Sequence, residues 1–375
     1  MKSTLTVRIP AKEPVAYPIV IGSGVLEKIS AELLNQHNQI VLITDNKVKK
    51  LYGDFLCRLL KNKGYKILLL SFSSGEKFKN KKTKDILEEQ MLSHSCKRHT
   101  LILALGGGVV GDLAGFIAAT YMRGIPYIQI PTTLLAMVDS SVGGKTGIDT
   151  SYGKNLIGAF WQPKAVIADI QCLSTLPKKQ LVNGLIEAVK IFLTCSLTDF
   201  KYLQKNIDKI LNYDAATLAM LVKKSIKIKA DIVQQDEREE NLRMVLNFGH
   251  TMGHALELVS DYKILHGYAV AYGILLETKV AELMGLLSPK NYNIIESLMK
   301  KLGIQAVDLN KFDIGQIIQA SKLDKKASAK TVNYILLKDL GVIHLGKNGK
   351  VVHPVPATII ENAFVAIMGE SSHGR

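Results

Sequence analysis

Cysteine is scarce in this sequence, and the four cysteines are too far apart to form a local motif. Cys57, Cys96, Cys172 and Cys195 include no C-x-x-C pair, which excludes a zinc knuckle and a thioredoxin-like redox centre. Disulfide-stapled secreted domains are excluded as well, because they are dense in cysteine. We expect all four thiols to be reduced.

Long apolar runs are also absent. The most apolar stretch, residues 101–122, is interrupted by glycines and by Asp112, so it falls short of the roughly 18 apolar residues of a membrane span. The first residues show a strand-like alternation and no apolar targeting segment. We therefore predict a folded cytoplasmic protein with no membrane partner.

Acidic residues are outnumbered, with 33 Asp and Glu against 48 Lys and Arg and a formal net charge of +15. The lysines are spread along the chain, and no signature of a nucleic-acid-binding module accompanies them. We predict an anionic small-molecule substrate and no nucleic-acid partner. A lysine-rich proteome explains the charge equally well.

The chain of 375 residues exceeds the roughly 250–300 residues at which a single core stops growing, so we expect two domains. In residues 1–177, short apolar runs alternate with helical periodicity, as at 79–93. Such alternation predicts an α/β, Rossmann-like nucleotide-binding domain with a parallel sheet. The runs that read as buried strands are 39–44, 65–70, 100–105, 126–130 and 165–169.

Residues 178–375 show mainly helical periodicity, which predicts an α-helical domain that binds metal and substrate. The segments concerned are 178–193, 218–233, 250–259, 267–284 and 290–302. Two strand-like segments, 331–337 and 341–345, predict a late hairpin that turns around Lys338 and Asp339.

Gly106, Gly108 and Gly111 form G-x-G-x-x-G between a predicted strand and an apolar helical segment. Such glycines let the backbone approach a pyrophosphate at a helix N-terminus, and a merely tight strand–helix turn is the alternative. The acidic residue usually found about 20 positions later is missing. Asp45 and Glu76, which each follow a predicted strand, could bind the ribose instead.

Three histidines predict a metal site. His250 and His254 are four residues apart, so they share one face of a helix, and this spacing is common in zinc sites. His266 follows closely, and Glu187 precedes Lys190 on another predicted helix. The spacing alone does not decide which two histidines bind the metal.

Residues 139–146 and 153–155 predict two glycine-rich turns, each of which presents a lysine, Lys145 and Lys154. Backbone N–H groups and a point charge suit a phosphate, although exposed loop lysines are the alternative. The G-K-T triplet lacks the spacing of a Walker loop, which argues against an ATPase.

Taken together, these motifs resemble the 3-dehydroquinate synthase family, a group of sugar phosphate cyclases, over nearly the whole chain. The matching segments, in order, are LALGGGVVGDLAGFIAATYMRG, QIPTTLLAMVDSSVGGKTGID, GKNLIGAFWQP, NGLIEAVK, DEREENLRMVLNFGHTMGHALE and LHG. The resemblance implies a homodimer with NAD and Zn²⁺, or Co²⁺ in its place, in a cleft between the domains. The implied lyase converts 3-deoxy-D-arabino-heptulosonate 7-phosphate to 3-dehydroquinate and phosphate, with transient oxidation and re-reduction.

The resemblance also implies roles for individual residues. The metal ligands it implies are Glu187, His250 and His266, which would leave His254 beside the substrate. The implied substrate-binding residues are Arg123, reaching from the partner subunit, and Asp139, Lys145, Asn155, Lys190, Lys229, Arg243, Asn247, His254 and Lys325. The implied catalytic residues are Lys145, Lys190, Glu239, Arg243, Asn247 and His254.

For NAD, the implied residues are Asp45, Glu76, Lys79, Gly107, Gly108, Asp112, Thr132, Thr133, Lys145, Lys154, Thr175 and Leu176. The chain departs from the family pattern at Tyr268, Gln180 and Cys172. Two rival functions share these motifs in part. One is another sugar phosphate cyclase, which makes an inosose or a valiolone, and the other is a metal-dependent polyol dehydrogenase, which would release NADH at each turnover.

Overall fold

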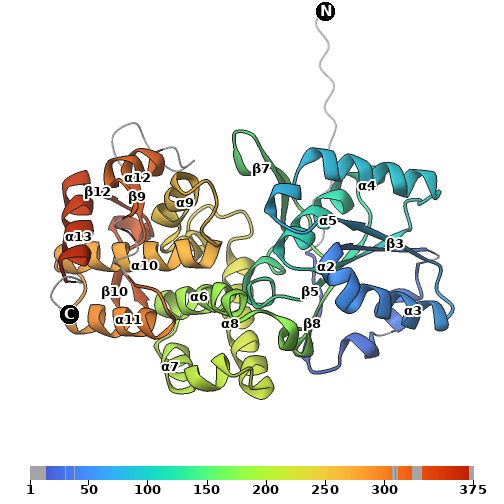
Figure 1. Ribbon diagram of the computed structural model, residues 1–375, viewed down its shortest axis with the longest axis horizontal. Coiled ribbons are helices and arrows are strands. Elements are labelled where there is room, and N and C mark those ends of the chain that lie inside the picture. The colour runs from blue at the N-terminus through green and yellow to red at the C-terminus, as the bar shows by residue number, and fades with distance from the viewer. Residues whose placement is uncertain are drawn as a thin grey trace, which may run out of the picture.

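The computed structural model describes residues 14–29, 31–37, 39–305, 309, 311–322 and 332–370. The strand-like alternation at the start of the chain and Lys325 lie outside these residues. An α/β part and a mainly helical part lie side by side (Figure 1). This confirms the predicted fold class.

The α/β part contains one six-stranded parallel sheet with the strand order β1-β8-β5-β4-β2-β3. The five predicted strands are confirmed, with bounds shifted by up to two residues, whereas β1 was not predicted. Along the chain the strands are β1 (Ile19–Gly22), β2 (Ile40–Asp45), β3 (Ile67–Phe72), β4 (Leu101–Gly106), β5 (Tyr127–Pro131) and β8 (Ala165–Asp169).

Alternate side chains of these strands enter two separate cores, because successive residues of a strand point to opposite faces. Val41 and Ile43 pack with α4 (Lys81–Ser93) and α5 (Gly108–Thr120) on one face. Ile40 and Leu42 pack with α3 (Asp54–Asn62) on the other face. Figure 1 shows the sheet between these helices. Burial of both faces explains why the strands read as continuous apolar runs.

The remaining short helices of this part are α1 (Ala31–Leu34) and α2 (Asn46–Val48).

An antiparallel hairpin of β6 (Lys145–Thr150) and β7 (Gly153–Phe160) stands apart from the sheet and extends between the two parts (Figure 1). The expectation that Lys145 and Lys154 stand in glycine-rich turns was wrong, because both lysines belong to these strands. A Cβ at Gly158 would lie 2.1 Å from the backbone oxygen of Thr146. The glycines therefore allow close pairing of the two strands.

The second part is mainly helical, and each of its five predicted helices is confirmed. None of the helices within the described residues is both long enough and apolar enough to cross a membrane. The four cysteines are free, as predicted. The helices are α6 (Lys178–Cys195), α7 (Leu197–Leu211), α8 (Ala215–Gln235), α9 (His250–Val259), α10 (His266–Leu283), α11 (Pro289–Lys301), α12 (Ile314–Ser321) and α13 (Ala357–Glu370).

The predicted late hairpin is only partly correct. β10 (Leu337–Asp339) pairs with β11 (Val342–Ile343), but β9 (Val332–Tyr334) pairs with β12 (His353–Val355). The turn lies at Leu340 and Gly341 and not at Lys338 and Asp339. Strand partners depend on contacts distant in sequence, which local alternation does not specify.

Helices α9 and α10 pack unusually closely because glycines lie between them. A Cβ at Gly273 would lie 1.9 Å from the backbone oxygen of Gly249, and one at Gly253 would lie 3.1 Å from Val270. Gly249 has a left-handed backbone (φ 75°) just before α9 begins, a conformation that glycine adopts without strain. The start of α9 is thereby held against α10.

This packing leads to a prediction for Gly273→Ala. The added methyl group meets a backbone oxygen that cannot rotate away, so we expect a loss of about 1–3 kcal/mol in the free energy of unfolding. Urea unfolding would measure it. Gly53→Ala is the matched control, since its nearest contact would be an ordinary 3.5 Å to a Thr44 methyl group. Equal stability of the two variants would contradict the prediction.

Candidate active site

Three side chains from three helices converge beside the hairpin. Glu187 lies in the middle of α6, whereas His250 and His266 are the first residues of α9 and α10. The Nε2 atoms of His250 and His266 lie 3.7 and 3.3 Å from Oε1 of Glu187. One carboxylate oxygen and two imidazole nitrogens within 4.8 Å of one another match the donor set of a three-ligand zinc site.

The buried carboxylate of Glu187 fits a cation. Its Oε1 has no hydrogen-bond partner among the described residues, and its Oε2 accepts from Lys190 on the next turn of α6. Burial alone would raise the pKa of Glu187, but Lys190, His250 and His266 outweigh it and hold the pKa well below its usual range. An ionised carboxylate oxygen that lies between two imidazoles and accepts no hydrogen bond is suited to a divalent metal.

The two imidazoles are oriented by their other nitrogens. His250 Nδ1 lies 3.1 Å from the carbonyl oxygen of Phe248, so it donates there and leaves Nε2 to face Glu187. Burial and the nearby Lys190 hold the pKa of His250 well below its usual range, which favours the neutral form that binds metals. His266 Nδ1 lies 3.4 Å from Oε2 of Glu257.

The sequence reasoning missed Glu257. This residue lies on α9, seven positions after His250, and only 2% of it is exposed. Its other oxygen, Oε1, accepts from Lys154 Nζ of β7 at 2.9 Å. The available indication was its spacing, because Glu257 lies one helical turn after His254 and two turns after His250 on the same helix.

His254 also lies close to His250 and His266. Its ring centroid is 5.3 Å from that of His250 and 6.1 Å from that of His266, and the residue is exposed. His254, Glu257 and His266 also bring ligand atoms within 4.8 Å of one another. Geometry therefore allows a second donor set, but its Glu257 is already paired with Lys154.

A cluster of predicted substrate residues adjoins the histidines. Lys229 of α8 donates to Oδ1 and to the backbone oxygen of Asp139 at 2.5 and 2.6 Å. Burial would raise the pKa of Asp139, but Lys229 and Lys190 outweigh it and lower the pKa to about 2. Lys190 is itself buried between Glu187 and Asp139, and the attraction of the two carboxylates raises its pKa against the effect of burial.

Glu239 joins the hairpin to the segment before α9. One of its oxygens pairs with Lys145 of β6, and the other accepts from Asn247 of η7 (Leu242–Asn247). Arg243 of the same segment donates to the backbone oxygen of Gly143 at 3.1 Å. The predicted residues Lys145, Glu239, Arg243 and Asn247 are therefore close together.

The predicted nucleotide site lies at the carboxyl edge of the sheet. Gly107 precedes α5 and Gly108 is its first residue. A Cβ at Gly107 would lie 3.1 Å from Thr133, and one at Gly108 would lie 3.2 Å from Ser140 Oγ. The absence of side chains leaves this helix N-terminus open to an anion. The buried hydroxyl of Thr132 has no hydrogen-bond partner among the described residues, which is consistent with a ligand there.

Asp45 is the last residue of β2, and Thr175 is the last residue of the 3-10 helical segment η6 (Ile170–Thr175), which follows β8. Asp45 Oδ1 caps α2 by accepting from the backbone nitrogens of Lys47 and Val48 at 2.8 and 3.1 Å. Thr175 Oγ1 lies 2.5 Å from the hydroxyl of Tyr52, which also donates to the backbone oxygen of Cys172 at 3.0 Å. Tyr52 was not predicted, because it comes from the π-helical segment η2 (Lys49–Gly53), far away in sequence.

Lys79 is buried among three carboxylates. Its Nζ lies 3.0 Å from Asp112, 3.2 Å from Glu76 and 3.9 Å from Asp149. Burial would lower the pKa of Lys79, but the three carboxylates outweigh it and raise the pKa. One cation does not balance three carboxylates. Burial and the neighbouring Glu76 accordingly raise the pKa of Asp149 to about 6, although Lys79 opposes them.

Asp149 predicts a pH dependence of stability. Its pKa is about 6 in the folded protein, against about 3.9 in an unfolded chain. The folded state binds this proton more tightly, so its stabilising effect is complete below about pH 4 and is lost as the pH rises through about 6.

Asp149→Asn removes the ionisation and keeps the oxygen that accepts from the backbone N–H of Asn155. We expect the variant to gain stability over the parent protein as the pH rises from about 4 to 8, by on the order of 1 kcal/mol. Urea unfolding across that range would measure the difference. A difference that stays constant with pH would contradict the prediction.

Two of the predicted residues, Arg123 and Asn155, are exposed. Arg123 is exposed in η4 (Tyr121–Arg123), beyond the C-terminal end of α5. Because α5 has 13 residues, about 20 Å of helix separates Arg123 from Gly107 and Gly108. Asn155 is exposed on the hairpin with a left-handed backbone (φ 54°).

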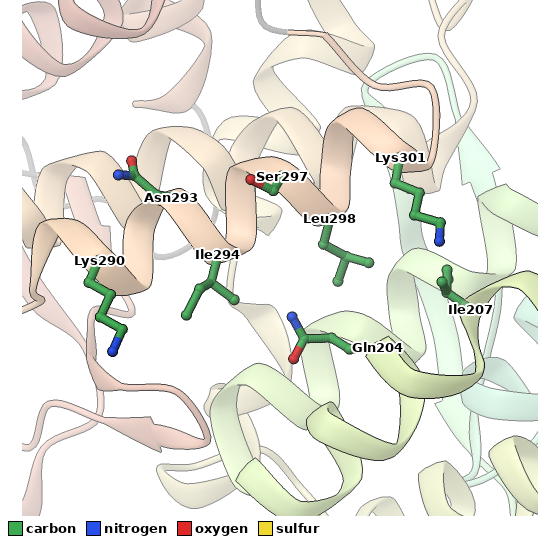
Figure 2. Close-up of a pocket in the computed structure, with 8 residues that line it drawn as sticks. All are labelled: Gln204, Ile207, Lys290, Asn293, Ile294, Ser297, Leu298 and Lys301. Carbon is green, nitrogen blue, oxygen red and sulfur yellow. The ribbon is translucent and has the colours of Figure 1, made fainter.

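A groove of about 690 Å³ lies elsewhere, between α7 and α11. Figure 2 shows Lys290 and Lys301 toward the two ends of the α11 segment and Gln204 of α7 pointing toward it. No residue of the candidate site lines this groove. The convergent polar side chains, and not this groove, therefore define the candidate site.

Comparison with known families gives two adjoining matches. Residues 69–183 match the model for 3-dehydroquinate synthase N-terminal, and residues 184–327 match the model for 3-dehydroquinate synthase C-terminal. A 3-dehydroquinate synthase of Desulforamulus reducens is 42% identical over 338 residues, which are 89% of this chain and 94% of the relative.

Two solved structures are also similar. A 2-deoxy-scyllo-inosose synthase complexed with carbaglucose-6-phosphate, NAD⁺ and Co²⁺ has a TM-score of 0.86 and 28% identity, covering 92% of this chain and 95% of its own. The 2-epi-5-epi-valiolone synthase of Streptomyces hygroscopicus, with NAD⁺ and Zn²⁺ bound, has a TM-score of 0.86 at 24% identity. It covers 97% of this chain and 100% of its own, and at this identity it supports the fold alone.

Proposed function

This chain belongs to the 3-dehydroquinate synthase family, and from that membership and the site we infer its reaction. It is a carbon–oxygen lyase that converts 3-deoxy-D-arabino-heptulosonate 7-phosphate to 3-dehydroquinate and phosphate, in aromatic amino acid biosynthesis. The observation on which the inference rests is the convergence of Glu187, His250 and His266 beside a cationic cluster and a nucleotide-binding sheet edge.

The cofactors are NAD and a divalent metal, zinc or cobalt. Glu187, His250 and His266 would hold the metal, and the backbone at Gly107 and Gly108 would hold the pyrophosphate. When bound, the nicotinamide supplies a reversible hydride acceptor and the metal supplies a Lewis acid. The unpartnered Oε1 of Glu187 and the space that side chains at Gly107 and Gly108 would fill support these assignments.

We assign the cationic side chains to the charged groups of the substrate. Lys145, Lys190, Lys229 and Arg243 are held in place by carboxylate or backbone oxygens, so they are preorganised for an anion. Cations fixed around a phosphate favour its departure, because they stabilise the charge that develops on the leaving group. The hydroxyls or the carboxylate of the substrate would be bound by Asp139, Asn155, Asn247 and His254. We also assign Lys325 to substrate binding.

We further propose that Glu239 and Asp139 orient the cationic side chains before the substrate binds. Glu239 holds Lys145 on the hairpin, and Asp139 holds Lys229 on α8. Fixed charges of this kind need no reorganisation during the reaction. The remaining nucleotide assignments are Asp45, Glu76, Lys79, Asp112, Thr132, Thr133, Lys145, Lys154, Thr175 and Leu176.

We further propose that the domain boundary lies between residues 177 and 178 and that the chain acts in the cytoplasm as a homodimer. Arg123 supports the dimer. It is exposed at the end of α5 away from Gly107 and Gly108 of its own subunit, and the family resemblance implies that it reaches the phosphate of a partner's site.

Another sugar phosphate cyclase is the nearest rival. The 2-deoxy-scyllo-inosose synthase shares the fold and binds the same kinds of cofactor, but the identity to the 3-dehydroquinate synthase is higher, at 42% against 28%. A polyol dehydrogenase would not need four cations in one cluster. Substrate preference therefore distinguishes the proposed function from the other sugar phosphate cyclase, and redox stoichiometry distinguishes it from the polyol dehydrogenase.

The experiment is a turnover assay with purified protein, NAD⁺ and the heptulosonate phosphate. We expect one phosphate released per substrate and no lasting absorbance of NADH, because the hydride returns to the product. NADH that accumulates in step with substrate consumption would favour a dehydrogenase instead. Phosphate release from glucose 6-phosphate, and not from the heptulosonate phosphate, would favour the inosose-type cyclase.

A further inference from the structure

Glu257 is a buried carboxylate beside the histidines of the metal site. Its two oxygens have different partners: Oε2 lies 3.4 Å from Nδ1 of His266, and Oε1 lies 2.9 Å from Nζ of Lys154. Only 2% of the residue is exposed, so these two contacts hold the carboxylate in place.

The position of Glu257 explains the orientation of His266. A histidine that binds a metal through Nε2 commonly donates its other N–H to a carboxylate, which fixes the tautomer and the plane of the ring. His266 points Nε2 at Glu187 and Nδ1 at Glu257, so the two carboxylates lie on opposite sides of one imidazole.

A direct role as a metal ligand fits Glu257 less well. His254, Glu257 and His266 have ligand atoms close enough for a metal, but Oε1 already faces the ammonium group of Lys154. A cation bound there would be repelled by that charge.

The pair with Lys154 connects two distant parts of the chain. Lys154 lies on β7, Glu257 lies on α9, and Lys154 Nζ also lies 4.6 Å from the centre of the Tyr262 ring. The same carboxylate thus contacts a metal-site histidine and the hairpin that bears predicted cofactor and substrate residues.

We propose that Glu257 is a positioning residue: it holds the His266 ring with Nε2 directed at the metal site and ties that ring to the β6–β7 hairpin through Lys154. The proposal deepens the proposed function, since it rests on the metal site of Glu187, His250 and His266. Glu257 acts through His266 and does not touch the reacting atoms.

The test measures metal affinity alone, without NAD or substrate. Zinc binding to the full-length protein is followed by competition with a chromophoric chelator. Glu257→Ala should weaken zinc binding by about 10–100-fold, the usual cost of losing such a partner. Glu257→Gln should weaken it by less than about tenfold, because its amide oxygen still accepts from His266 Nδ1.

Lys154→Met separates the two contacts of Glu257. It removes the tie to the hairpin and keeps the bond to His266, so zinc affinity should change by less than about threefold. Asp261→Asn is the matched control, because this exposed carboxylate just after α9 pairs only with Lys263 in the described residues. Its zinc affinity should equal that of the parent protein.

A cobalt-loaded sample gives a second measurement that a purely structural role would not change. The visible absorption of Co²⁺ depends on ligand geometry, so Glu257→Ala should alter the spectrum and Asp261→Asn should not. Thermal unfolding of the metal-free variants shows whether each one folds. If Glu257→Ala does not fold, Glu257→Gln and Lys154→Met still test the proposal, because a larger loss of zinc affinity in Lys154→Met than in Glu257→Gln would overturn it.

Three results would overturn the proposal. The first is zinc affinity in Glu257→Ala within about twofold of the parent protein, because a positioning residue costs more than that. The second is an equal loss of affinity in Lys154→Met. The third is complete loss of zinc in Glu257→Ala together with retention in Glu187→Ala, which would make Glu257 a ligand. Because no turnover is measured, a failed cyclase assay would leave these results unaffected.

Discussion

Glu187→Gln should empty the metal site and lower turnover by on the order of 10³-fold, the effect of losing several kcal/mol of Lewis-acid stabilisation. Glutamine has nearly the same volume, so α6 keeps its packing. Its amide is a much poorer ligand than a carboxylate, and a three-ligand site has no donor to spare. Elemental analysis and phosphate release would measure the two effects.

The folding of Glu187→Gln must be measured separately. Lys190 is fully buried beside Glu187, and an uncompensated buried charge costs roughly 3–5 kcal/mol. Glu282→Gln is the matched control, because Glu282 forms an ion pair of the same i, i+3 spacing with Lys279 on α10, away from the metal ligands. The control should keep zinc and activity. Full zinc occupancy in folded Glu187→Gln would refute the assignment of the ligand.

His254→Ala should keep zinc bound while activity falls about 10²–10³-fold, the usual cost of losing one polar contact to a developing charge. The structure supports this expectation, since Nε2 of His250 and Nε2 of His266 lie 3.7 and 3.3 Å from Glu187 Oε1. His266→Ala should instead weaken zinc binding steeply. Metal titration of both variants at one pH would measure the difference.

The alternative to this prediction is specific. If His254, Glu257 and His266 form the metal site, His254→Ala loses zinc and Glu187→Gln retains it. Retention of zinc in His266→Ala with loss in His254→Ala would contradict the ligand set outright. Either outcome would move the metal toward the exposed end of the histidine group and leave Oε1 of Glu187 without a cation.

The fold class followed from the sequence because burial leaves a local pattern. The strand cores of 40–45 and 101–106 are continuous apolar runs since both faces of their sheet are covered. The predicted helix 250–259 matches α9 because its apolar side chains recur at helical spacing. The hairpin of β6 and β7 was not predicted, because β7 is largely exposed and glycines interrupt both strands, so neither strand carries such a pattern.

The sequence predicted the metal ligands only as a group of candidates. Spacing placed His250 and His254 on one helix face, and it did not decide between His254 and His266. Glu257 was missed although it stands in the same motif, because a buried carboxylate and an exposed one look alike in sequence.

By itself, therefore, the sequence determined the alternation of strands and helices, the glycine loop at a strand end and the residue types of a metal and anion site. These are local properties, set by periodicity and by the backbone freedom of glycine. Only the tertiary structure decided which groups face one another. The close packing of α9 on α10 at Gly249 and Gly273 turns His250 and His266 toward Glu187. The hairpin brings Lys154 to Glu257 across 103 positions, a contact that no local pattern encodes.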